Sequence, residues 1–226
     1  AAAVVPMCEA IAERVRPRAA GFVETLKDVS LVDPQEDADG GEDLRRELHL
    51  HGPVAMYIGN LQPYQGIDLL LEAFGLALRN TPDATLVIIG GSDTDISAYG
   101  RKIRRMDLGE RVHLVGPRPV SQLGYFMSQA DVLVSPRTRG INTPMKVYSY
   151  LDSGIPVVAT NLPTHTQVMT DEVSKLAEPD AESFAAAMSA LFQDPEERRR
   201  LAANAKELVR REHSEEAFRR QVHRIF

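Results

Sequence analysis

The sequence predicts an α/β fold in which a parallel sheet is covered by helices on both faces. From about residue 50 onward, short apolar runs alternate with segments of helical periodicity, a pattern typical of parallel strands joined by crossover helices. The runs are almost continuously apolar, as expected of strands that are buried on both faces. A length of 226 residues with 43% hydrophobic and 26% charged residues fits an ordinary globular protein.

Six apolar runs are expected to be strands, the last of them weak: residues 54–59, 84–90, 111–116, 131–135, 156–160 and 174–176. The other periodic segments are expected to be helices: residues 67–78, 97–106, 120–129, a short helix from 144, another near His165, and 181–192 and 195–211. Residues 10–15 can form one more short helix before the regular part of the chain begins.

Residues 131–160 are the unit around which the rest is organised. Thr143 is suited to cap a helix, and Pro144 is suited to its first position, where the missing N–H costs nothing. Gly154 is suited to end that helix in a left-handed conformation. The unit therefore reads as strand, helix, strand, and its two strands are expected to be parallel neighbours.

Two regions are expected along the chain. Residues 1–40 are interpreted as the tail of a missing N-terminal domain followed by an acidic connection, because residues 33–42 read DPQEDADGGE. Residues 41–226 are interpreted as one domain. The sequence shows neither internal repeats nor low-complexity tracts.

Charge and cysteine content narrow the class of protein. A net charge of −6 and a pI near 5.6 argue against a nucleic-acid partner. Cys8 is the only cysteine, which excludes an internal disulfide and favours a cytoplasmic location. No apolar run approaches the roughly 20 residues of a membrane span. The basic segment 196–211 reads as an amphipathic packing helix, with peripheral membrane contact as the alternative.

Glycine or proline turns follow the first four strands: Gly59-Asn60, Gly90-Gly91, Gly116-Pro117 and Ser135-Pro136-Arg137. The carboxyl ends of parallel strands meet at one edge of the sheet, and glycines there allow a ligand to approach the backbone. This favours a nucleotide or phosphate site, although such turns need glycine in any case. GxxxxGK[ST] is absent, and so is a strict GxGxxG that opens a helix.

Three cations follow the fourth strand without an intervening acid: Arg137, Arg139 and Lys146. Lys146 falls at the expected third position of the short helix, where the helix dipole disfavours a cation. An anion among these groups would remove the repulsion. The alternative is a solvated basic loop whose lysine points outward.

Several blocks in a fixed order carry a family resemblance: YIGNLQPYQGIDLLLEAF, ATLVIIGG, ERVHLVGPRP, ADVLVSPR and SGIPVVAT. Over roughly residues 50–212 the chain resembles the C-terminal, donor-binding domain of the group 1 glycosyltransferases. The resemblance implies one Rossmann-like half of a GT-B fold. It also implies transfer from a nucleotide-diphosphate sugar with retention of configuration and without a metal or other cofactor. The acceptor, a glycan, lipid or small molecule, would be held by the missing domain.

The chain departs from the family pattern at four positions. The family has Arg and Lys on the donor diphosphate where this sequence has Asn60 and Gln65. It has two glutamates where this sequence has Ile141 and Ser149. The second glutamate normally grips the ribose, and a serine there is expected to make a weaker contact.

We therefore expect a relocated diphosphate site. Arg137 and Arg139 would contact the phosphates, and Lys146 would neutralise the β-phosphate or the leaving oxygen. Asn142, Lys146 and Ser149 would share one line along the helix start, so that Asn142 or Thr143 could bond the sugar hydroxyls. The turn glycines Gly59, Gly91 and Gly116 would lie beside the donor, with backbone near Gly116 reading the base, as in the family.

The alternatives are a non-catalytic binding or regulatory domain and, less favoured, a GT-B sugar-nucleotide epimerase or phosphorylase. Among the histidines, His113 is expected in the core or at a sheet edge. His165 is equally compatible with the ligand edge and with the interior. His49 and His51 have no convincing metal-binding spacing, and no metal site is expected.

Overall fold

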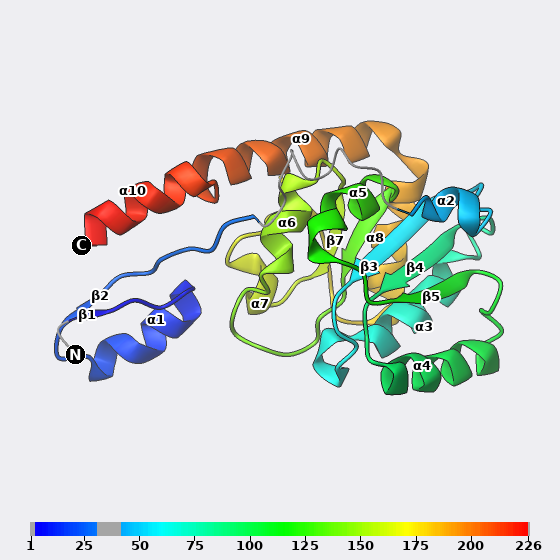
Figure 1. Cartoon of the computed structure of the whole chain (residues 1–226), viewed down its shortest axis with the longest axis horizontal. Helices are drawn as coiled ribbons and strands as arrows, with labels where there is room; N and C mark the ends of the chain where they lie inside the picture. Colours follow the sequence, from blue (N-terminus) through cyan, green and yellow to red (C-terminus); the bar gives the residue numbers. More distant parts are fainter. Residues whose placement is uncertain (1–2, 31–41, 226) are drawn as a thin grey trace.

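The computed structural model describes residues 3–30 and 42–225. Its main feature is a six-stranded sheet in which every neighbouring pair of strands is parallel, in the order β5-β4-β3-β6-β7-β8 (Figure 1). The strands are β3 (Val54–Ile58), β4 (Thr85–Ile89), β5 (Val112–Gly116), β6 (Val132–Ser135), β7 (Val157–Thr160) and β8 (Lys175–Ala177). The predicted α/β class, a Rossmann-like parallel sheet, is confirmed.

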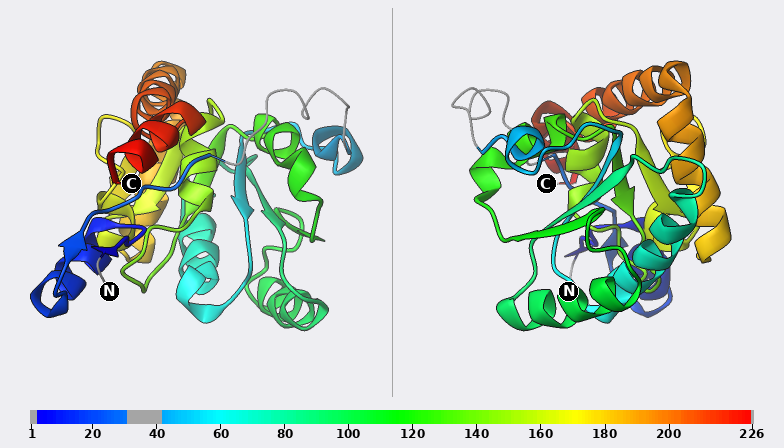
Figure 2. Two further views of the ribbon diagram at one scale, coloured as in Figure 1. Left: turned by 60° about the vertical axis from the view of Figure 1, so that its left-hand side comes forward. Right: turned by 90° about the vertical axis from the view of Figure 1, so that its right-hand side faces the viewer.

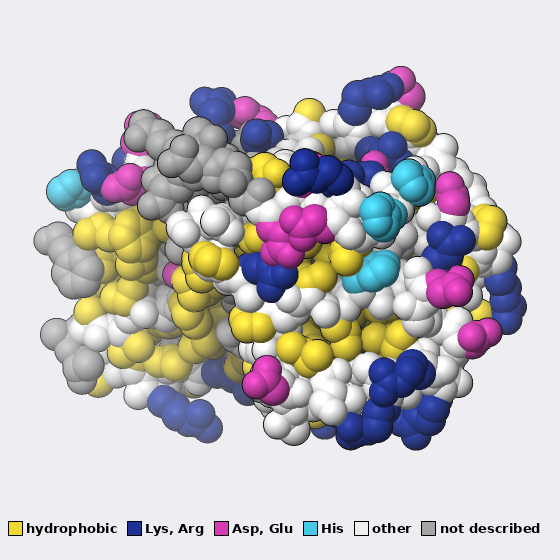
Figure 3. Space-filling view, turned by 45° about the vertical axis from the view of Figure 1, so that its right-hand side comes forward, with side chains coloured by type: hydrophobic (Ala, Val, Ile, Leu, Met, Phe, Trp, Pro, Cys, Tyr) yellow, Lys and Arg dark blue, Asp and Glu magenta, His cyan; other side chains and the backbone are white. Residues whose placement is uncertain are grey.

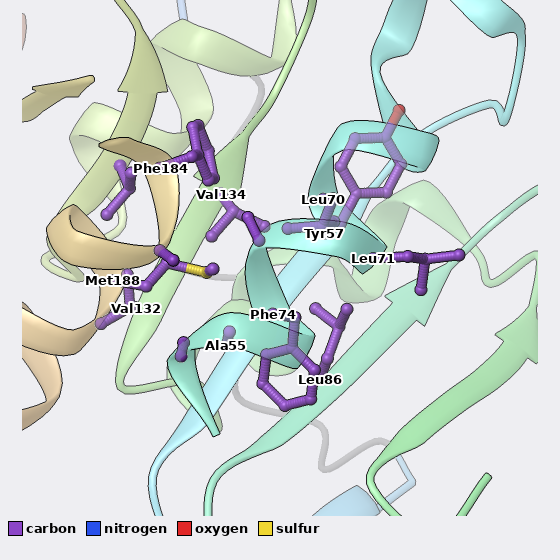
Figure 4. Close-up of a cluster of buried hydrophobic side chains, with 14 of the residues drawn as sticks. Ala55, Tyr57, Leu70, Leu71, Phe74, Leu86, Val132, Val134, Phe184 and Met188 are labelled. Carbon is purple, nitrogen blue, oxygen red and sulfur yellow. The ribbon is translucent and has the colours of Figure 1, made fainter. Parts of the chain in front are cut away.

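Helices cover both faces of this sheet. One face packs against α3 (Ile67–Ala77), α4 (Asp93–Arg105) and α8 (Ala181–Gln193). Figure 4 shows the middle of this layer, where Phe74 of α3 and Met188 of α8 lie with Val132 and Val134 of β6. The other face packs against α2 (Leu44–Glu47), α5 (Leu123–Ser128), α6 (Lys146–Asp152) and α9 (Pro195–Glu212). The short α7 (Pro163–Thr166) follows β7.

Residues 3–30 contain a small unit outside the main sheet: β1 (Ala3–Val4), α1 (Glu9–Val15) and β2 (Phe22–Val23), with β1 and β2 parallel. This unit and α10 (Glu215–Ile225) lie at the same end of the molecule (Figures 1 and 2). Lys27 pairs with Glu212 at 2.8 Å, and His213 Nδ1 donates to the Asp28 carbonyl at 3.2 Å. The segment after β2 is thereby fastened to the junction of α9 and α10.

The expected strands all occur, each within one or two residues of its predicted bounds. Three helices differ from expectation. α4 begins at Asp93 because Ser92 and Asp95 form a capping box. Residues 120–129 divide into a 3₁₀ turn, Val120–Gln122, and α5. α6 begins at Lys146 and not at Pro144.

Two helices were not predicted, α2 and α10, and most of the predicted acidic connection, residues 33–42, lies outside the described residues. Within residues 3–30 and 42–225, none of the helices combines the length and apolar character needed to cross a bilayer.

Candidate functional site

Three of the predicted turns meet at the carboxyl edge of the sheet. Gly59 N–H donates to the Ile89 carbonyl at 2.9 Å, and Gly90 N–H donates to the Gly116 carbonyl at 2.8 Å. Gly90 has a φ of 113°, and a Cβ there would lie only 2.1 Å from the Gly59 carbonyl oxygen. The backbones of these turns are therefore as close as glycine allows, and Gly91 packs beside them against Leu61.

The turn after β3 is also joined to the loop after β6. Gly66 has a φ of 75°, and a Cβ there would lie 1.9 Å from the carbonyl oxygen of Pro136. Thr138 N–H donates to the Tyr64 carbonyl at 3.0 Å. The prediction that these loops lie together at one edge is thus confirmed, and the loop carrying the cations is held against the loop carrying Gln65.

The side chain of Lys146 turns inward at this junction. Its Nζ lies 3.8 Å from the centre of the Tyr57 ring and 3.4 Å from Gln65 Oε1. A Cβ added to Gly59 would lie 3.3 Å from Lys146 Nζ. Burial, with a further contribution from the charge of Arg137, holds the pKa of Lys146 well below its usual value. The lysine is therefore not the outward-pointing cation of the alternative interpretation.

Arg137 is also largely buried, with 8% of its surface exposed. Its Nε donates to the Arg139 carbonyl at 2.7 Å, and a terminal nitrogen donates to Asn142 Oδ1 at 3.0 Å. The guanidinium lies 5.2 Å from the centre of the Tyr64 ring. Burial lowers the pKa of Arg137, although its ordinary value is high enough that the group stays charged. The third predicted cation, Arg139, is exposed.

No carboxylate of the described residues lies within 4 Å of Arg137, Arg139 or Lys146. Their partners there are amide and carbonyl oxygens and two tyrosine rings. Such neutral groups offset only part of the cost of burying a cation. An anion held between these groups would supply the missing compensation, as the sequence led us to expect.

Several details of the expected site are wrong. Because α6 begins at Lys146, this residue opens the helix, and Asn142 lies outside it, so Asn142, Lys146 and Ser149 do not share a helical line. Thr143 is buried beside the Tyr148 hydroxyl and does not cap the helix. α6 has only seven residues, and we assign no role to its dipole. Ser149 is completely buried, which removes it as a direct ribose contact in this arrangement.

The two positions that lack the family's cations take different roles. Asn60 is exposed, and its Oδ1 accepts a hydrogen bond from Gln62 N–H at 3.3 Å. Gln65 is buried and accepts from Lys146. From the sequence, we expected Gln65 to mark only the loss of a family cation. In the structure it contacts Lys146, the residue that we expected to replace that cation.

Sequence reasoning missed the tyrosines beneath the cations. Tyr57 donates to the Asn60 carbonyl at 2.6 Å, and the Tyr150 hydroxyl accepts from Ile58 N–H at 2.7 Å. Burial raises the pKa of both hydroxyls, which therefore stay protonated and neutral. The available signal was Tyr57 in β3 and Tyr64 in the turn before Gln65, both close in sequence to a loop expected to meet the cations, whereas Tyr150 lies on α6 itself.

Of the histidines, His113 lies on an edge strand and His165 lies in the interior, whereas His49 and His51 are exposed. His113 is half-buried on the edge strand β5, in agreement with the expectation. His165 is fully buried beneath the cationic loop, so its side chain belongs to the interior. The described residues contain no cluster of His, Cys, Asp or Glu suited to a metal ion.

Comparison with known proteins identifies relatives of this chain. The family model described as "Glycosyl transferases group 1" matches residues 42–208. The chain is 30% identical over 166 residues to "Putative glycosyltransferase YtcC" of Bacillus subtilis, a match covering 69% of the chain and 40% of the relative. It is 28% identical over 194 residues to "D-inositol 3-phosphate glycosyltransferase" of Corynebacterium glutamicum, covering 81% and 46%. The matched segments thus cover less than half the length of these relatives.

Solved structures share the fold. Anabaena Alr3699/HepE in complex with UDP superimposes with a TM-score of 0.83 at 17% identity, covering 100% of this chain and 63% of that one. The same Anabaena protein in complex with UDP-glucose gives a TM-score of 0.81 at 18% identity with the same coverage.

Proposed function

Because the chain belongs to the group 1 glycosyl transferases, we propose that it is the donor-binding domain of a retaining glycosyltransferase. Its donor is a nucleotide-diphosphate sugar, and its acceptor is a glycan, lipid or small molecule held by a further domain. Residues 42–208 carry the family match. The relatives are more than twice as long as the matched segment, which is compatible with a second domain that binds the acceptor.

The observation that carries this proposal is the pair of inward-facing cations that have no carboxylate partner among residues 3–30 and 42–225. Arg137 and Lys146 lie at the edge where the glycine turns meet. A diphosphate offers this edge an anion that can accept several charge-assisted hydrogen bonds. The binding of a diphosphate would also remove much of the cost of keeping Lys146 desolvated and charged.

The same cations suit the chemistry of transfer. When the bond between the anomeric carbon and the β-phosphate oxygen breaks, the electron pair stays on that oxygen and the diphosphate gains negative charge. Lys146 acts on this oxygen, and Arg137 and Arg139 act on the remaining phosphate oxygens. Three protein cations take the place of a divalent metal in this role, and we therefore propose transfer without metal.

Other predicted residues take supporting roles. Asn142, which already orients Arg137, faces the sugar, and the backbone at Gly116 faces the base. Thr143 and Ser149 are not assigned ligand contacts, because both are buried. The ring of Tyr64, with 37% of the residue's surface accessible, has its centre 5.2 Å from the Arg137 guanidinium carbon.

A second candidate is a sugar-nucleotide-binding domain without catalysis. Ile141 and Ser149 favour it, because the family carries glutamates at those positions. Both candidates require donor binding, and only the first requires transfer.

The test is calorimetric titration of this chain with UDP, GDP and ADP in the presence of EDTA. We expect one of them to bind with a Kd in the micromolar range, about −8 kcal/mol, without added metal. Absence of binding by all three would contradict both candidates. Transfer is then measured with the full-length chain, and a full-length protein that binds donor but releases no nucleoside diphosphate in the presence of acceptor extracts supports the second candidate.

A further inference from the structure

The segment from the end of β7 through α7 holds the cationic loop by its backbone. Three carbonyls of residues 137–142 accept hydrogen bonds from its side chains: Arg137 from Thr160 Oγ1 at 2.6 Å, Ile141 from Gln167 Nε2 at 2.8 Å, and Asn142 from Thr164 Oγ1 at 2.8 Å. The loop lies between β6 and α6 and has no regular backbone pairing of its own. Its shape therefore depends on these side chains together with the backbone hydrogen bond from Thr138 to Tyr64.

His165 stands at the centre of this segment and is fully buried. Its Nδ1 lies 3.0 Å from the Thr160 carbonyl oxygen, and because a carbonyl can only accept, Nδ1 carries the proton. Its Nε2 lies 2.8 Å from Ser135 Oγ and accepts the serine proton. The ring thus connects the ends of β6 and β7 as a neutral imidazole with one donor and one acceptor in use.

The same ring sets the direction of the Thr160 hydroxyl. Thr160 Oγ1 lies 3.0 Å from His165 Nδ1, and its own proton goes to the Arg137 carbonyl. With an N–H facing it, the hydroxyl oxygen serves as acceptor toward the histidine and as donor toward Arg137. The chain of hydrogen bonds therefore runs in one direction, from Ser135 through His165 and Thr160 to the backbone of Arg137.

Electrostatics agrees with a neutral ring. Burial lowers the pKa of His165 to about 4, and the charges of Lys146 and Arg137 act in the same direction, while the hydrogen bond to Thr160 acts against them. A charged imidazole here would add a third buried cation to the two already present. Neutral His165 can fix the loop without adding to their repulsion.

We propose that His165 is a positioning residue for donor binding: through Thr160 it holds the Arg137 backbone so that the guanidinium is already aimed at the diphosphate. This inference rests on the donor site proposed above. Its physical content is preorganisation, since a loop fixed before binding does not lose its conformational freedom when the ligand arrives. The repulsion between Arg137 and Lys146 would otherwise favour an open loop in the absence of ligand.

The test uses three variants and a matched control. Thr160→Val removes the hydroxyl that donates to Arg137 and keeps the shape of the side chain. His165→Phe removes both ring contacts, whereas His165→Asn keeps an N–H near the position of Nδ1. The control is Thr85→Val, the same change at a buried threonine at the start of β4, at the opposite edge of the same sheet.

Binding of UDP, GDP, ADP and inorganic pyrophosphate is measured by calorimetry, and melting temperature is recorded for each variant. We expect Thr160→Val and His165→Phe to weaken the Kd for pyrophosphate and for the nucleotide that binds by about tenfold. His165→Asn should stay within about threefold of the wild type, as should the Thr85→Val control. A rescue of binding by asparagine separates a positioning histidine from one that only fills the core.

A second readout needs no ligand. In the ¹⁵N-labelled chain, the Nε–H of Arg137 is assigned by its absence from an Arg137→Lys sample. We expect this proton to exchange slowly with water in the wild type and in Thr85→Val, and rapidly in Thr160→Val. If His165→Phe does not fold, Thr160→Val alone decides the question.

The inference is overturned if the wild type binds pyrophosphate or a nucleotide and Thr160→Val binds equally well with its Arg137 proton still protected. In that case the donor site stands. If the wild type binds neither a nucleoside diphosphate nor pyrophosphate, the donor site itself fails, and the positioning role fails with it.

Discussion

Two groups of cations in this chain differ in burial and not in charge. Arg101, Arg104 and Arg105 on α4 are exposed and line an open hollow of about 430 Å³. Arg137 and Lys146 face inward against tyrosine rings. Neither group has a carboxylate within 4 Å among the described residues. The absence of an acidic partner is therefore informative only where the cation has also lost much of its contact with water.

The α4 arginines need no carboxylate partner, because water and dissolved ions stabilise their charges. Exposed charges are hydrated and screened, and an unpaired arginine on a surface helix costs little. Figure 3 shows how widely basic and acidic side chains are interspersed on one face of the molecule. Lys146 is partly buried against the Tyr57 ring and the Gln65 amide, and a bound anion would replace the hydration that it has lost there. This difference supports the proposal that the donor binds at the second group.

The largest expected effect is from Lys146→Met, which keeps the length of the side chain and removes its charge. We expect donor binding to weaken by at least about a hundredfold, because a desolvated charge pair is lost. The protein itself should not be destabilised, since the variant no longer buries a cation. Calorimetry and thermal melting measure the two effects, with Lys206→Met on the exposed side of α9 as the matched control. If Lys146→Met bound the donor as tightly as the wild type does, the inward-facing cations would contribute no more to binding than the exposed arginines of α4.

A smaller effect is expected when an internal carboxylate is supplied. In Gln65→Glu an acid would stand at the position that now accepts from Lys146 Nζ at 3.4 Å. The new carboxylate competes with the diphosphate for the lysine, so we expect the Kd for the nucleotide to weaken by about tenfold or more. Asn60→Asp, at an exposed position of the same turn, is the control and should weaken binding less. Unchanged binding by Gln65→Glu would show that Lys146 does not meet the phosphates.

Part of this fold and site could be predicted from the sequence, and part could not. The strands could be located because burial on both faces leaves an apolar run that needs no tertiary information. The turns and the cationic loop followed from strand direction. The start of α6 did not, because local capping preferences favoured Thr143 and Pro144, and tertiary packing placed Thr143 against Tyr148 instead.

The inward orientation of the Lys146 side chain could not be predicted from the sequence either. It depends on Tyr57 and Gln65, which come from a strand and a turn far away in the sequence, and spacing along α6 carries no information about them. His165 illustrates the same limit. Its sequence neighbours allowed both a ligand-facing and an interior position, and only the register of β6 beside β7 places Ser135 next to it.

A moderate effect is expected from pH. The pKa of Lys146 is lowered in the folded chain, so between that pKa and about 10.5 the unfolded chain binds more protons than the folded one. The free energy of unfolding should therefore rise with pH across this window in the wild type, and rise less in Lys146→Met. Denaturant titrations between pH 7 and pH 10 measure the difference.

Ligand binding should shift the pKa of Lys146 in the opposite direction to burial. A diphosphate beside Lys146 raises the pKa of the lysine, so proton uptake accompanies binding wherever the free site is partly deprotonated. The Kd should consequently weaken severalfold as pH rises, and titrations in buffers of different ionisation enthalpy should report the uptake. The groups facing the lysine are Tyr57, Arg137 and His165, and His165, with its pKa lowered to about 4, stays neutral over this range. A Kd independent of pH would contradict the linkage.

The smallest effect is expected from the exposed arginines, and it completes the comparison. Replacing Arg101, Arg104 and Arg105 together by Gln removes three positive charges, more than any single change at the site. Yet the donor should bind within about twofold of the wild type at 0.15 M salt, because exposed charges act only over roughly 8 Å there. The arginines lie toward the end of α4, whereas the turns meet near its beginning. A loss comparable to that of Lys146→Met would mean that total charge, and not burial beside the glycine turns, attracts the donor.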